Sequence, residues 1–426
     1  MRDQPDVLII GAGPAGAVAA ALLAQRGYDV LVLERQWFPR FSIGESLLAY
    51  SAQLLMDVGM LDAVVAAGFQ YKNGAAFVCD DRRAEFNFAD KVSSGCPFTF
   101  QVVRSDFDLV LANAAERFGA TIRYGVEITA VDVSDEVPTV TSRSDSGETA
   151  LHRPRFVLDA SGFGRTLPRL LNLEKPSNFP VRAARFCHIK DNIVAGEFDR
   201  QKIRIGIHPT QRDVWSWLIP FSNGTCSLGV VAAPELLARW SRPASADETG
   251  GLDIWSLVAQ EPALRALLRD AHTIRPVGEI VGYSANVSSL YGPSFALLGN
   301  AAEFLDPVFS SGVTIAMHSA KLAADVLHRQ FRGEAVNWQV EFADALMFGI
   351  ETFRTFVTTW YDGTLQDVIF YPDKSPEIHR RICSVLAGYV WDPANPYNGP
   401  QSRRRLRALA DMCRPVASRR ADENHC

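Results

Sequence analysis

A strand, a glycine-rich turn, a helix and a second strand follow one another at the start of the chain, and no other feature restricts the fold as strongly. Residues 6–10 and 29–33 are almost wholly apolar without polar alternation, as in parallel strands buried on both faces of a sheet. Between them lies Gly11-Ala-Gly-Pro-Ala-Gly16, followed by an Ala- and Leu-rich stretch over 17–25 that predicts a helix. The pattern predicts a βαβ unit of a doubly wound α/β fold.

The glycines of this turn have separate physical tasks in a dinucleotide site. Gly11 permits the tight turn, Gly13 lets the backbone approach a pyrophosphate, and Gly16 allows the helix to pack closely on the strand. The helix N-terminus then faces the phosphates. Glu34 ends the second strand and is placed to accept hydrogen bonds from a ribose. We therefore expect this end of the chain to bind a dinucleotide.

Composition narrows the classes of protein that remain. The chain has 426 residues, which is too long for one hydrophobic core and suggests two or three domains. With 47% hydrophobic and 21% charged residues, it is not a disordered or low-complexity protein. A net charge of −5 argues against broad, nonspecific nucleic-acid binding, which requires clustered positive charge.

The cysteines and the apolar runs bear on the compartment. There are 7 cysteines, without a CxxC pair or a Cys/His cluster with zinc spacing. We therefore expect reduced thiols in a cytoplasmic protein, and no metal site. Residues 1–6 are polar and do not resemble a secretion signal. The longest apolar run, residues 15–24, is too short to span a bilayer.

Two later segments complete a three-part pattern that resembles the FAD-binding fold of the glutathione reductase and p-hydroxybenzoate hydroxylase type. One is Arg104-Ser-Asp-Phe-Asp108. The other is Leu298-Gly-Asn-Ala-Ala-Glu-Phe-Leu-Asp-Pro307, which follows a buried-strand pattern and precedes a predicted helix. In this superfamily the last segment contacts the ribityl chain and the flavin. It usually contains Gly-Asp. Here Asn300 replaces the Asp. Its amide can still hydrogen-bond the ribityl chain, so we expect FAD binding to be kept.

Four motifs, in chain order, resemble the flavin-dependent halogenases, in particular the branch that acts on phenols and pyrroles. Residues 38–48, Phe-Pro-Arg-Phe-Ser-Ile-Gly-Glu-Ser-Leu-Leu, resemble the family's segment along the flavin. Lys72, in Tyr-Lys-Asn-Gly-Ala, stands where the family has its essential lysine. Trp215-Ser-Trp-Leu-Ile-Pro220 is a complete WxWxIP motif, and Asp306-Pro-Val-Phe-Ser-Ser-Gly-Val313 resembles the halide-site loop.

The resemblance implies that FAD, oxygen and a halide, chloride or bromide, act together to halogenate an electron-rich ring. The amides of Ser311 and Gly312 are the expected halide donors, because they open a helix. Lys72 is expected to hold the oxidised halogen, by a hydrogen bond or as a haloamine. Trp215 and Trp217 are expected to prevent direct oxygen transfer to the substrate. The residues expected to bind FAD are Gly11, Gly13, Ala15, Gly16, Glu34, Arg40, Ile43, Arg104, Ile128, Gly299, Asn300, Asp306 and Val313.

One departure from the family bears on the substrate. Tryptophan halogenases carry a glutamate in the halide loop where this chain has Phe309. A phenol or pyrrole is activated by its own heteroatom. The substrate is therefore expected to be phenolic or pyrrolic, free or carrier-tethered, from a pigment or antibiotic pathway. Glu303 and Asp306 are candidates for a general base, on proximity in sequence alone.

Three other functions remain open at this point. A flavin aromatic hydroxylase shares the fold but transfers oxygen, and Lys72 and the tryptophan pair argue against it. A reductase resembling geranylgeranyl reductases shares related N-terminal segments. A flavoprotein without chemistry would serve in an assembly. The sequence shows no second GxGxxG unit for a nicotinamide cofactor, so we expect a separate flavin reductase to supply reduced flavin.

The resemblance and the local patterns together predict an α/β protein in three parts. Residues 1–175 and 275–335 form a Rossmann-like FAD-binding domain, with helical periodicity over 46–67. Residues 176–274 form an inserted β-sheet on the substrate side, and residues 336–426 a helical C-terminal cover. Several aromatic residues of the cover are expected to line the substrate cavity or, equally, to form core: Phe353, Phe356, Trp360, Tyr361, Phe370 and Tyr371.

The end of the chain is basic. Its arginines are Arg403, Arg404, Arg405, Arg407, Arg414, Arg419 and Arg420. The segment is either a solvated terminus or a docking surface for an acidic acyl or peptidyl carrier protein that holds the substrate.

Overall fold

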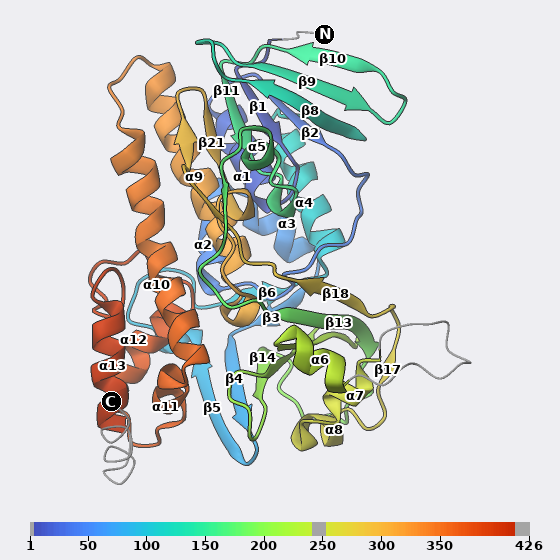
Figure 1. The fold of residues 1–426 in the computed structure, drawn as a ribbon, viewed down its shortest axis with the longest axis vertical. Helices are drawn as coiled ribbons and strands as arrows, with labels where there is room; N and C mark the ends of the chain where they lie inside the picture. The colour runs from blue at the N-terminus through green and yellow to red at the C-terminus, as the bar shows by residue number, and fades with distance from the viewer. Residues whose placement is uncertain (1–3, 241–252, 414–426) are drawn as a thin grey trace.

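Two large β-sheets dominate the protein. The computed structural model describes residues 4–240 and 253–413. A six-stranded sheet lies in the upper half of Figure 1 and an eight-stranded sheet in the lower half, with helices along one side of both. The expected α/β class with a C-terminal helical region is confirmed.

The six-stranded sheet is the doubly wound part. Its strands run in the order β20-β21-β11-β1-β2-β7, and all neighbours are parallel apart from β20 and β21. The strands are β1 Val7–Ile10, β2 Val30–Glu34, β7 Thr121–Tyr124, β11 Phe156–Asp159, β20 Tyr291–Gly292 and β21 Phe295–Leu297. Strands β1, β2 and β11 are buried along their whole length, as their unbroken apolar runs predicted.

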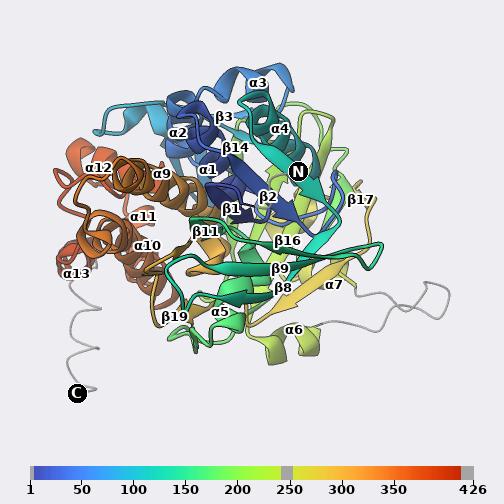
Figure 2. The same cartoon turned by 90° about the horizontal axis from the view of Figure 1, so that it is seen from above.

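Alternate side chains of this sheet enter two layers, because successive residues of a strand point to opposite faces. Val7 and Ile9 pack in the main hydrophobic cluster with three helices: α1 (Pro14–Gln25), α4 (Arg104–Arg117) and α9 (Ser311–Phe331). Leu8 and Ile10 pack on the other side, against a three-stranded antiparallel sheet and the short α5 (Thr166–Leu170). That sheet consists of β8 Val126–Asp132, β9 Thr139–Ser144 and β10 Thr149–His152. Figure 2 shows β1 and β2 between these layers.

The second large sheet has the order β17-β13-β16-β15-β14-β4-β5, and β18 also pairs with β13. Its strands are β4 Gly74–Cys79, β5 Arg82–Asn87, β13 Ala183–Lys190, β14 Lys202–Ile207, β15 Trp215–Pro220, β16 Thr225–Ala232, β17 His272–Thr273 and β18 Gly278–Val281. Three short helices pack with it in smaller hydrophobic clusters: α6 Pro234–Trp240, α7 Trp255–Val258 and α8 Pro262–Leu267.

This sheet reaches beyond the range that the sequence division gave it. Strands β4 and β5 come from residues 74–87, which were placed with the FAD-binding domain, and β4 pairs in parallel with β14. The pairing joins segments more than a hundred residues apart, so no local pattern reveals it. The two parts of the chain therefore share a sheet, and the segment that carries Lys72 leads directly into it.

The helical pattern over 46–67 is broken in two. Helix α2 covers Ala49–Val58 and α3 covers Leu61–Ala66, because Gly59 adopts a left-handed φ of 78° that ends the first helix. Ser46 is extended and bridges Gln101 of β6 (Thr99–Gln101), which pairs with β3 (Gln70–Lys72). Another two-stranded pair joins β12 Glu174–Lys175 and β19 Asn286–Val287, and four 3-10 turns cover Phe88–Asp90 (η1), Gly162–Gly164 (η2), Gly299–Ala301 (η3) and Pro307–Phe309 (η4).

The C-terminal cover is helical, as expected. It consists of a π-helical turn Gln339–Asp344 (η5), α10 Ala345–Tyr361, α11 Thr364–Phe370, α12 Pro376–Leu386 and α13 Ser402–Cys413. Helix α10 packs on α9, whereas α11 and α12 pack on β5, so the cover spans both large sheets (Figure 1). Of its aromatic side chains, Phe353, Phe356 and Trp360 are fully buried in the core, and Tyr361 and Phe370 are partly buried and pack against it.

The cysteines within the described ranges carry free thiols, and Cys426 lies outside these ranges. In the same ranges no group of His, Cys, Asp and Glu side chains is placed to hold a metal ion. Over residues 4–240 and 253–413, no helix is both long and apolar enough to cross a membrane.

Candidate functional site

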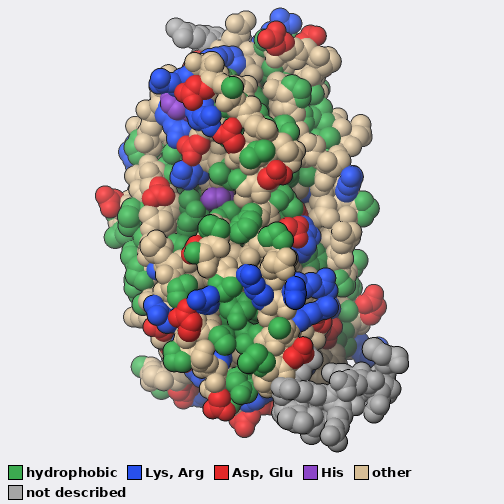
Figure 3. Space-filling model, turned by 90° about the vertical axis from the view of Figure 1, so that its left-hand side faces the viewer, with side chains coloured by type: hydrophobic (Ala, Val, Ile, Leu, Met, Phe, Trp, Pro, Cys, Tyr) green, Lys and Arg blue, Asp and Glu red, His purple; other side chains and the backbone are tan. Residues whose placement is uncertain are grey.

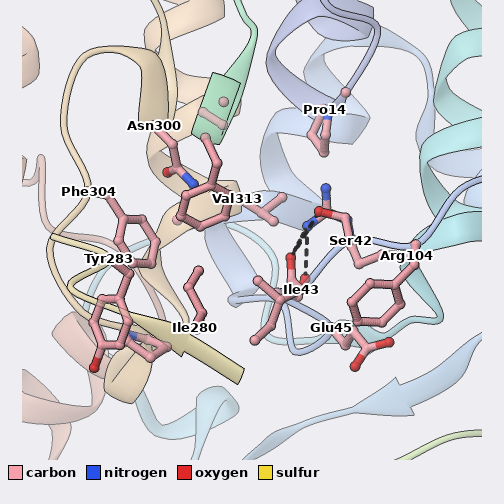
Figure 4. Close-up of a pocket in the computed structure, with 18 of the residues that line it drawn as sticks. Pro14, Ser42, Ile43, Glu45, Arg104, Ile280, Tyr283, Asn300, Phe304 and Val313 are labelled. Atoms are coloured by element: carbon pink, nitrogen blue, oxygen red, sulfur yellow. Dashed lines mark hydrogen bonds between the residues drawn. The ribbon is translucent and has the colours of Figure 1, made fainter. Parts of the chain in front are cut away.

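A cavity of about 460 Å³ lies where the two large sheets meet. Its walls come from the turn after β1, the segment 34–46, the turn after β11, one face of the eight-stranded sheet and the start of α9 (Figure 4). Most of the predicted site residues line it: Gly11, Gly13, Ala15, Glu34, Arg40, Ile43, Arg104, Asn300, Gly312, Val313, Trp215 and Trp217. Six others do not: Gly16, Lys72, Ile128, Gly299, Asp306 and Ser311.

The dinucleotide end of the cavity is formed by the first βαβ unit. Gly11 has a left-handed φ of 94°, and a Cβ there would lie 2.8 Å from the carbonyl oxygen of Ala160. A Cβ on Gly16 would lie 1.9 Å from the carbonyl oxygen of Gly11, so this glycine permits the close packing of α1 without touching the cavity. Glu34 accepts the amide of Ala12 at 2.9 Å and so also fixes the turn itself.

Arg104 connects the start of α4 to the segment that runs along the cavity. Its guanidinium donates to both carboxylate oxygens of Asp108, at 2.7 and 2.9 Å, and to the carbonyl oxygen of Ile43 at 2.6 Å. Arg40 donates to the same carboxylate at 2.9 Å. Asp108 is fully buried, and the sequence analysis gave it no role. Its position four residues after Arg104 on a helix was the available signal.

The far end of the cavity carries the second nucleotide-binding segment. The Oδ1 atom of Asn300 is buried and has no hydrogen-bond partner among the described residues. Gly299 lies behind it, with a φ of 53° and its amide donated to the hydroxyl of Ser319 at 2.9 Å. Ile128 packs in the cluster on the other face of the six-stranded sheet, so its side chain does not border the cavity.

These features fit FAD. The glycine turn would admit a pyrophosphate, and Glu34, whose two oxygens each accept one backbone amide, would use a remaining lone pair for a ribose hydroxyl. The unpartnered Asn300 oxygen would accept a ribityl hydroxyl. Arg104 holds the backbone of Ile43 and Gly44 at the cavity wall, where a flavin ring would lie against it.

The loop before α9 turns at Ser310, which has a φ of 55° and provides no side-chain cap for the helix. The first N–H groups of a helix have no partner within it. Those of Ser311, Gly312 and Val313 are in this position, and Gly312 and Val313 line the cavity. The aligned dipoles of a 21-residue helix add positive potential at this point. The arrangement suits a small anion, although the Ser311 side chain itself is turned into the protein.

Neither candidate for a general base borders the cavity. Asp306 is 4% exposed and accepts hydrogen bonds from the backbone amide of Val308 and from the hydroxyls of Tyr283 and Tyr361. Burial raises the pKa of this carboxyl, and the three hydrogen bonds oppose the rise. The expected FAD contact of Asp306 therefore finds no support, because the carboxylate is occupied within the protein. Glu303 forms an ion pair with Arg354.

Lys72 is 1% exposed and lies directly behind the cavity wall. Its Nζ donates to the Ser46 hydroxyl at 2.8 Å and to the carbonyl oxygen of Leu47 at 2.6 Å, and it lies 5.3 Å from the centroid of the Phe88 ring. Burial lowers the pKa of Lys72 to about 7. Ser46 lines the cavity, so the side chain that accepts the Lys72 amine belongs to a residue of the cavity wall.

The two tryptophans of β15 face the cavity, and their polar atoms are already bonded. Trp215 donates its indole N–H to the Tyr361 hydroxyl at 3.0 Å, and Trp217 donates to the Ser227 hydroxyl at 3.1 Å. Several lining residues of the same region were not predicted: Phe41, Glu45, Ser46, Ala184, Phe186, Ile203, Ile219, Ser227, Glu279, Ile280, Tyr283 and Phe304. Those on β13 to β16 alternate along their strands, and this is the signal that marks one sheet face.

Together the fold and the cavity define an FAD-binding flavoprotein. A family model for the FAD binding domain matches residues 4–192. The chain is 41% identical to a structure described as a flavoprotein/dehydrogenase from Cytophaga hutchinsonii, with a TM-score of 0.90 over 96% of this chain and 98% of that one.

Two relatives narrow the class. A 1H-pyrrole-2-carbonyl-(peptidyl-carrier protein) brominase of Pseudoalteromonas luteoviolacea is 30% identical over 91% of this chain and 92% of its own. The corresponding chlorinase of Pseudomonas fluorescens is 28% identical over 99% of this chain and 95% of its own. The chain belongs to the flavin-dependent halogenase family. It is thus an FAD-dependent halogenating oxidoreductase, and the hydroxylase, reductase and non-catalytic interpretations give way.

Two of the three glycines of the turn, Gly13 and Gly16, provide a matched pair of variants. Gly16→Ala is expected to lower the free energy of unfolding by about 2 kcal/mol or more, because the new Cβ meets a backbone oxygen at 1.9 Å. Gly13→Ala meets only a flexible Arg40 nitrogen at 3.5 Å, and should leave the apo protein as stable while weakening FAD binding. Chemical denaturation and flavin titration measure the two effects. Equal destabilisation by both variants would contradict this assignment.

Burial of Lys72 predicts a pH-dependent stability difference. Its pKa is about 7 in the folded protein and 10.5 in the unfolded chain. Between these two pH values the unfolded chain binds more protons than the folded protein, so the free energy of unfolding rises with pH. Relative to Lys72→Met, the native chain should gain unfolding free energy between pH 7 and 10, by at most about 1.4 kcal/mol per pH unit. Denaturant titrations at several pH values measure this gain. A difference between the two proteins that is constant with pH would refute the lowered pKa.

Proposed function

We propose that the protein chlorinates or brominates a neutral, electron-rich phenolic or pyrrolic ring in a natural-product pathway. The observation that carries the proposal is the buried amine of Lys72 behind the Ser46 hydroxyl, at the wall of a cavity that also holds the FAD cradle and an uncapped helix start. When bound and reduced, FAD supplies with oxygen the oxidising power that converts a halide ion to hypohalous acid.

The halide is proposed to bind at the start of α9. The amides of Ser311 and Gly312 donate to it, and Val313 follows them in the same turn. Hypohalous acid formed beside this site must be held by a side chain, because free hypohalous acid would oxidise other side chains at random. We propose that the Lys72 amine holds it. The hypohalous acid would take the position of the Ser46 hydroxyl, to which the amine donates a hydrogen bond.

Lys72 is proposed to deliver the halogen in one of two ways. As a hydrogen-bond donor it holds the hypohalous acid in place. As a neutral amine it forms an N–X bond and releases water, after which the ring carbon takes the halogen and the amine regains a proton from the ring. A pKa of about 7 makes both forms accessible near neutral pH. Trp215 and Trp217 are proposed to keep the ring away from the flavin end and so prevent direct oxygen transfer.

The cavity wall argues for a substrate without a free carboxylate. On the sheet side, the N–H groups of both tryptophans are bonded within the protein, and the Tyr283 hydroxyl is turned to Asp306. The cationic residues in the lining, Arg35, Arg40 and Arg104, lie at the dinucleotide end. A carboxylate placed against the sheet would therefore lose its water without gaining a cationic donor.

A carrier-tethered acyl group meets this requirement, because its carboxyl is masked as a thioester. The brominase and chlorinase relatives are named for such carrier-bound pyrroles. Arg403, Arg404 and Arg405 of helix α13 are exposed, and they are proposed as a docking site for an acidic carrier. On the face shown in Figure 3, basic side chains lie in groups that also contain acidic ones. Arg414, Arg419 and Arg420 lie outside the described residues. Reduced flavin is proposed to come from a separate reductase.

The test is an assay with a separate NADH-dependent flavin reductase, chloride or bromide, and a panel of phenols and pyrroles, read by mass spectrometry. We expect a halogenated product from the native chain and none from Lys72→Met, while both bind FAD and consume oxygen alike. Lys202→Met is the matched control: Lys202 is also buried, on β14, but pairs with Asp199. Halogenation that survives in Lys72→Met, or a product that gains only oxygen, would contradict the proposal.

A second assay compares one aromatic acid with its methyl ester and its thioester. The neutral forms should have kcat/KM values about tenfold or more above the acid, because an unpaired carboxylate in the cavity costs at least about 1.4 kcal/mol. The same comparison in a flavin-free mixture with hypohalous acid gives the intrinsic reactivity of each ring. If the acid is turned over as well as the ester after this correction, the sheet wall does not select for neutral substrates.

A further inference from the structure

The buried carboxylate of Asp306 joins parts of the cavity wall that come from distant segments. Its Oδ1 accepts the amide of Val308 at 3.0 Å, within the turn that leads to the start of α9. Its Oδ2 accepts two hydroxyls, from Tyr283 at 3.1 Å and from Tyr361 at 2.8 Å. Both the loop and Tyr283 border the cavity. One carboxylate oxygen thus binds the backbone of the loop, and the other binds the two tyrosines that hold the carboxylate in place.

Tyr361 extends this network to the tryptophan strand. It is the last residue of α10, and its hydroxyl donates to Asp306 while it accepts the indole N–H of Trp215 at 3.0 Å. The guanidinium carbon of Arg182 lies 4.5 Å from the centroid of its ring, and Arg182 is itself paired with Asp213 at 2.8 Å. The Tyr361 hydroxyl is therefore held with its proton toward the carboxylate and its lone pair toward the indole.

Tyr361 does not line the cavity, so it has no direct contact with a halide or a ring there. Its hydroxyl hydrogen-bonds one residue of the WxWxIP motif, Trp215, and one of the halide loop, Asp306. These two motifs lie about ninety residues apart and belong to different elements. The Tyr361 hydroxyl accepts from Trp215 of one wall and donates to Asp306 of the other. It therefore fixes the distance between the two walls.

We propose that Tyr361 is a positioning residue that locks the Trp215 wall to the halide loop through Asp306. The inference rests on the proposed function, in which the helix start after this loop binds the halide. The hydrogen bonds from Tyr361 and Tyr283 orient Asp306, Asp306 orients the Val308 amide, and the turn at Pro307–Phe309 then sets the direction of the first α9 amides. Loss of the Tyr361 hydroxyl loosens the loop and the indole together.

The primary variant is Tyr361→Phe, which keeps the ring and removes both hydrogen bonds. Its matched control is Tyr389→Phe, which removes a buried hydroxyl that donates to the carbonyl oxygen of Cys96 at 2.9 Å, away from the cavity lining. We expect Tyr361→Phe to raise the KM for bromide about five- to tenfold, as the loss of a hydrogen bond to a buried carboxylate predicts. FAD affinity should stay within twofold. Tyr389→Phe should change neither value.

A double-variant cycle separates positioning from general stability. Trp215→Phe removes the indole N–H and keeps an aromatic ring. Because Tyr361 mediates its link to the loop, Trp215→Phe combined with Tyr361→Phe should give the same bromide KM as Tyr361→Phe alone. Effects of the two substitutions that multiply, or a bromide KM in Tyr361→Phe that matches the native chain or the Tyr389→Phe control, would overturn the inference.

A binding measurement keeps this test distinct from the test of the proposed function. Bromide is titrated into the FAD-loaded protein, and the absorption of the oxidised flavin is followed. A weaker bromide response in Tyr361→Phe than in Tyr389→Phe supports the positioning role whether or not a substrate has been found. An equal response in both variants refutes it, even if the native chain halogenates. Absence of halogenation in the native chain counts against the proposed function alone.

Discussion

The segment 40–46 is fixed from three sides, and the cavity depends on it. Arg104, paired with the buried Asp108, holds the carbonyl oxygens of Ile43 and Gly44 from the six-stranded sheet side. Glu45 contacts His188 of β13 at 2.8 Å, which ties the segment to the eight-stranded sheet. Ser46 then bridges β6 and accepts the Lys72 amine. Since both parts of the protein contribute to these contacts, this short stretch of backbone ties the two sheets together at the cavity wall.

The polar atoms of the cavity wall are likewise held by contacts within the protein. Tryptophan and tyrosine side chains supply area for a ring to pack on, while their N–H and O–H groups are used inside the protein. Recognition on the sheet side therefore rests on shape and stacking. In the proposed function, polar recognition is concentrated at the two ends, where the glycine turn, Arg104 and Asn300 would receive the cofactor and the uncapped start of α9 would receive an anion.

How much of the site was predictable depended on the range of the interaction. The glycine turn and Glu34 belong to one βαβ unit, so their arrangement followed from spacing. Ser46 and Lys72 come together only because β3 and β6 pair. Each of these strands has three residues, which is too short for a recognisable strand pattern in the sequence. Asp306 was read as a cofactor contact because it stands in the loop, whereas its direction is decided by two tyrosines from other segments.

The sequence by itself determined the nucleotide-binding unit, the order of the motifs and the family, because these depend on backbone constraints and short-range patterns within a few consecutive residues. Tertiary structure alone decided that β4 joins the second sheet and that Lys72 is buried against Ser46 and Leu47. The physical reason is burial. A lysine's pKa, a carboxylate's partners and a tryptophan's role are set by what excludes water from them, and those groups arrive from every part of the chain.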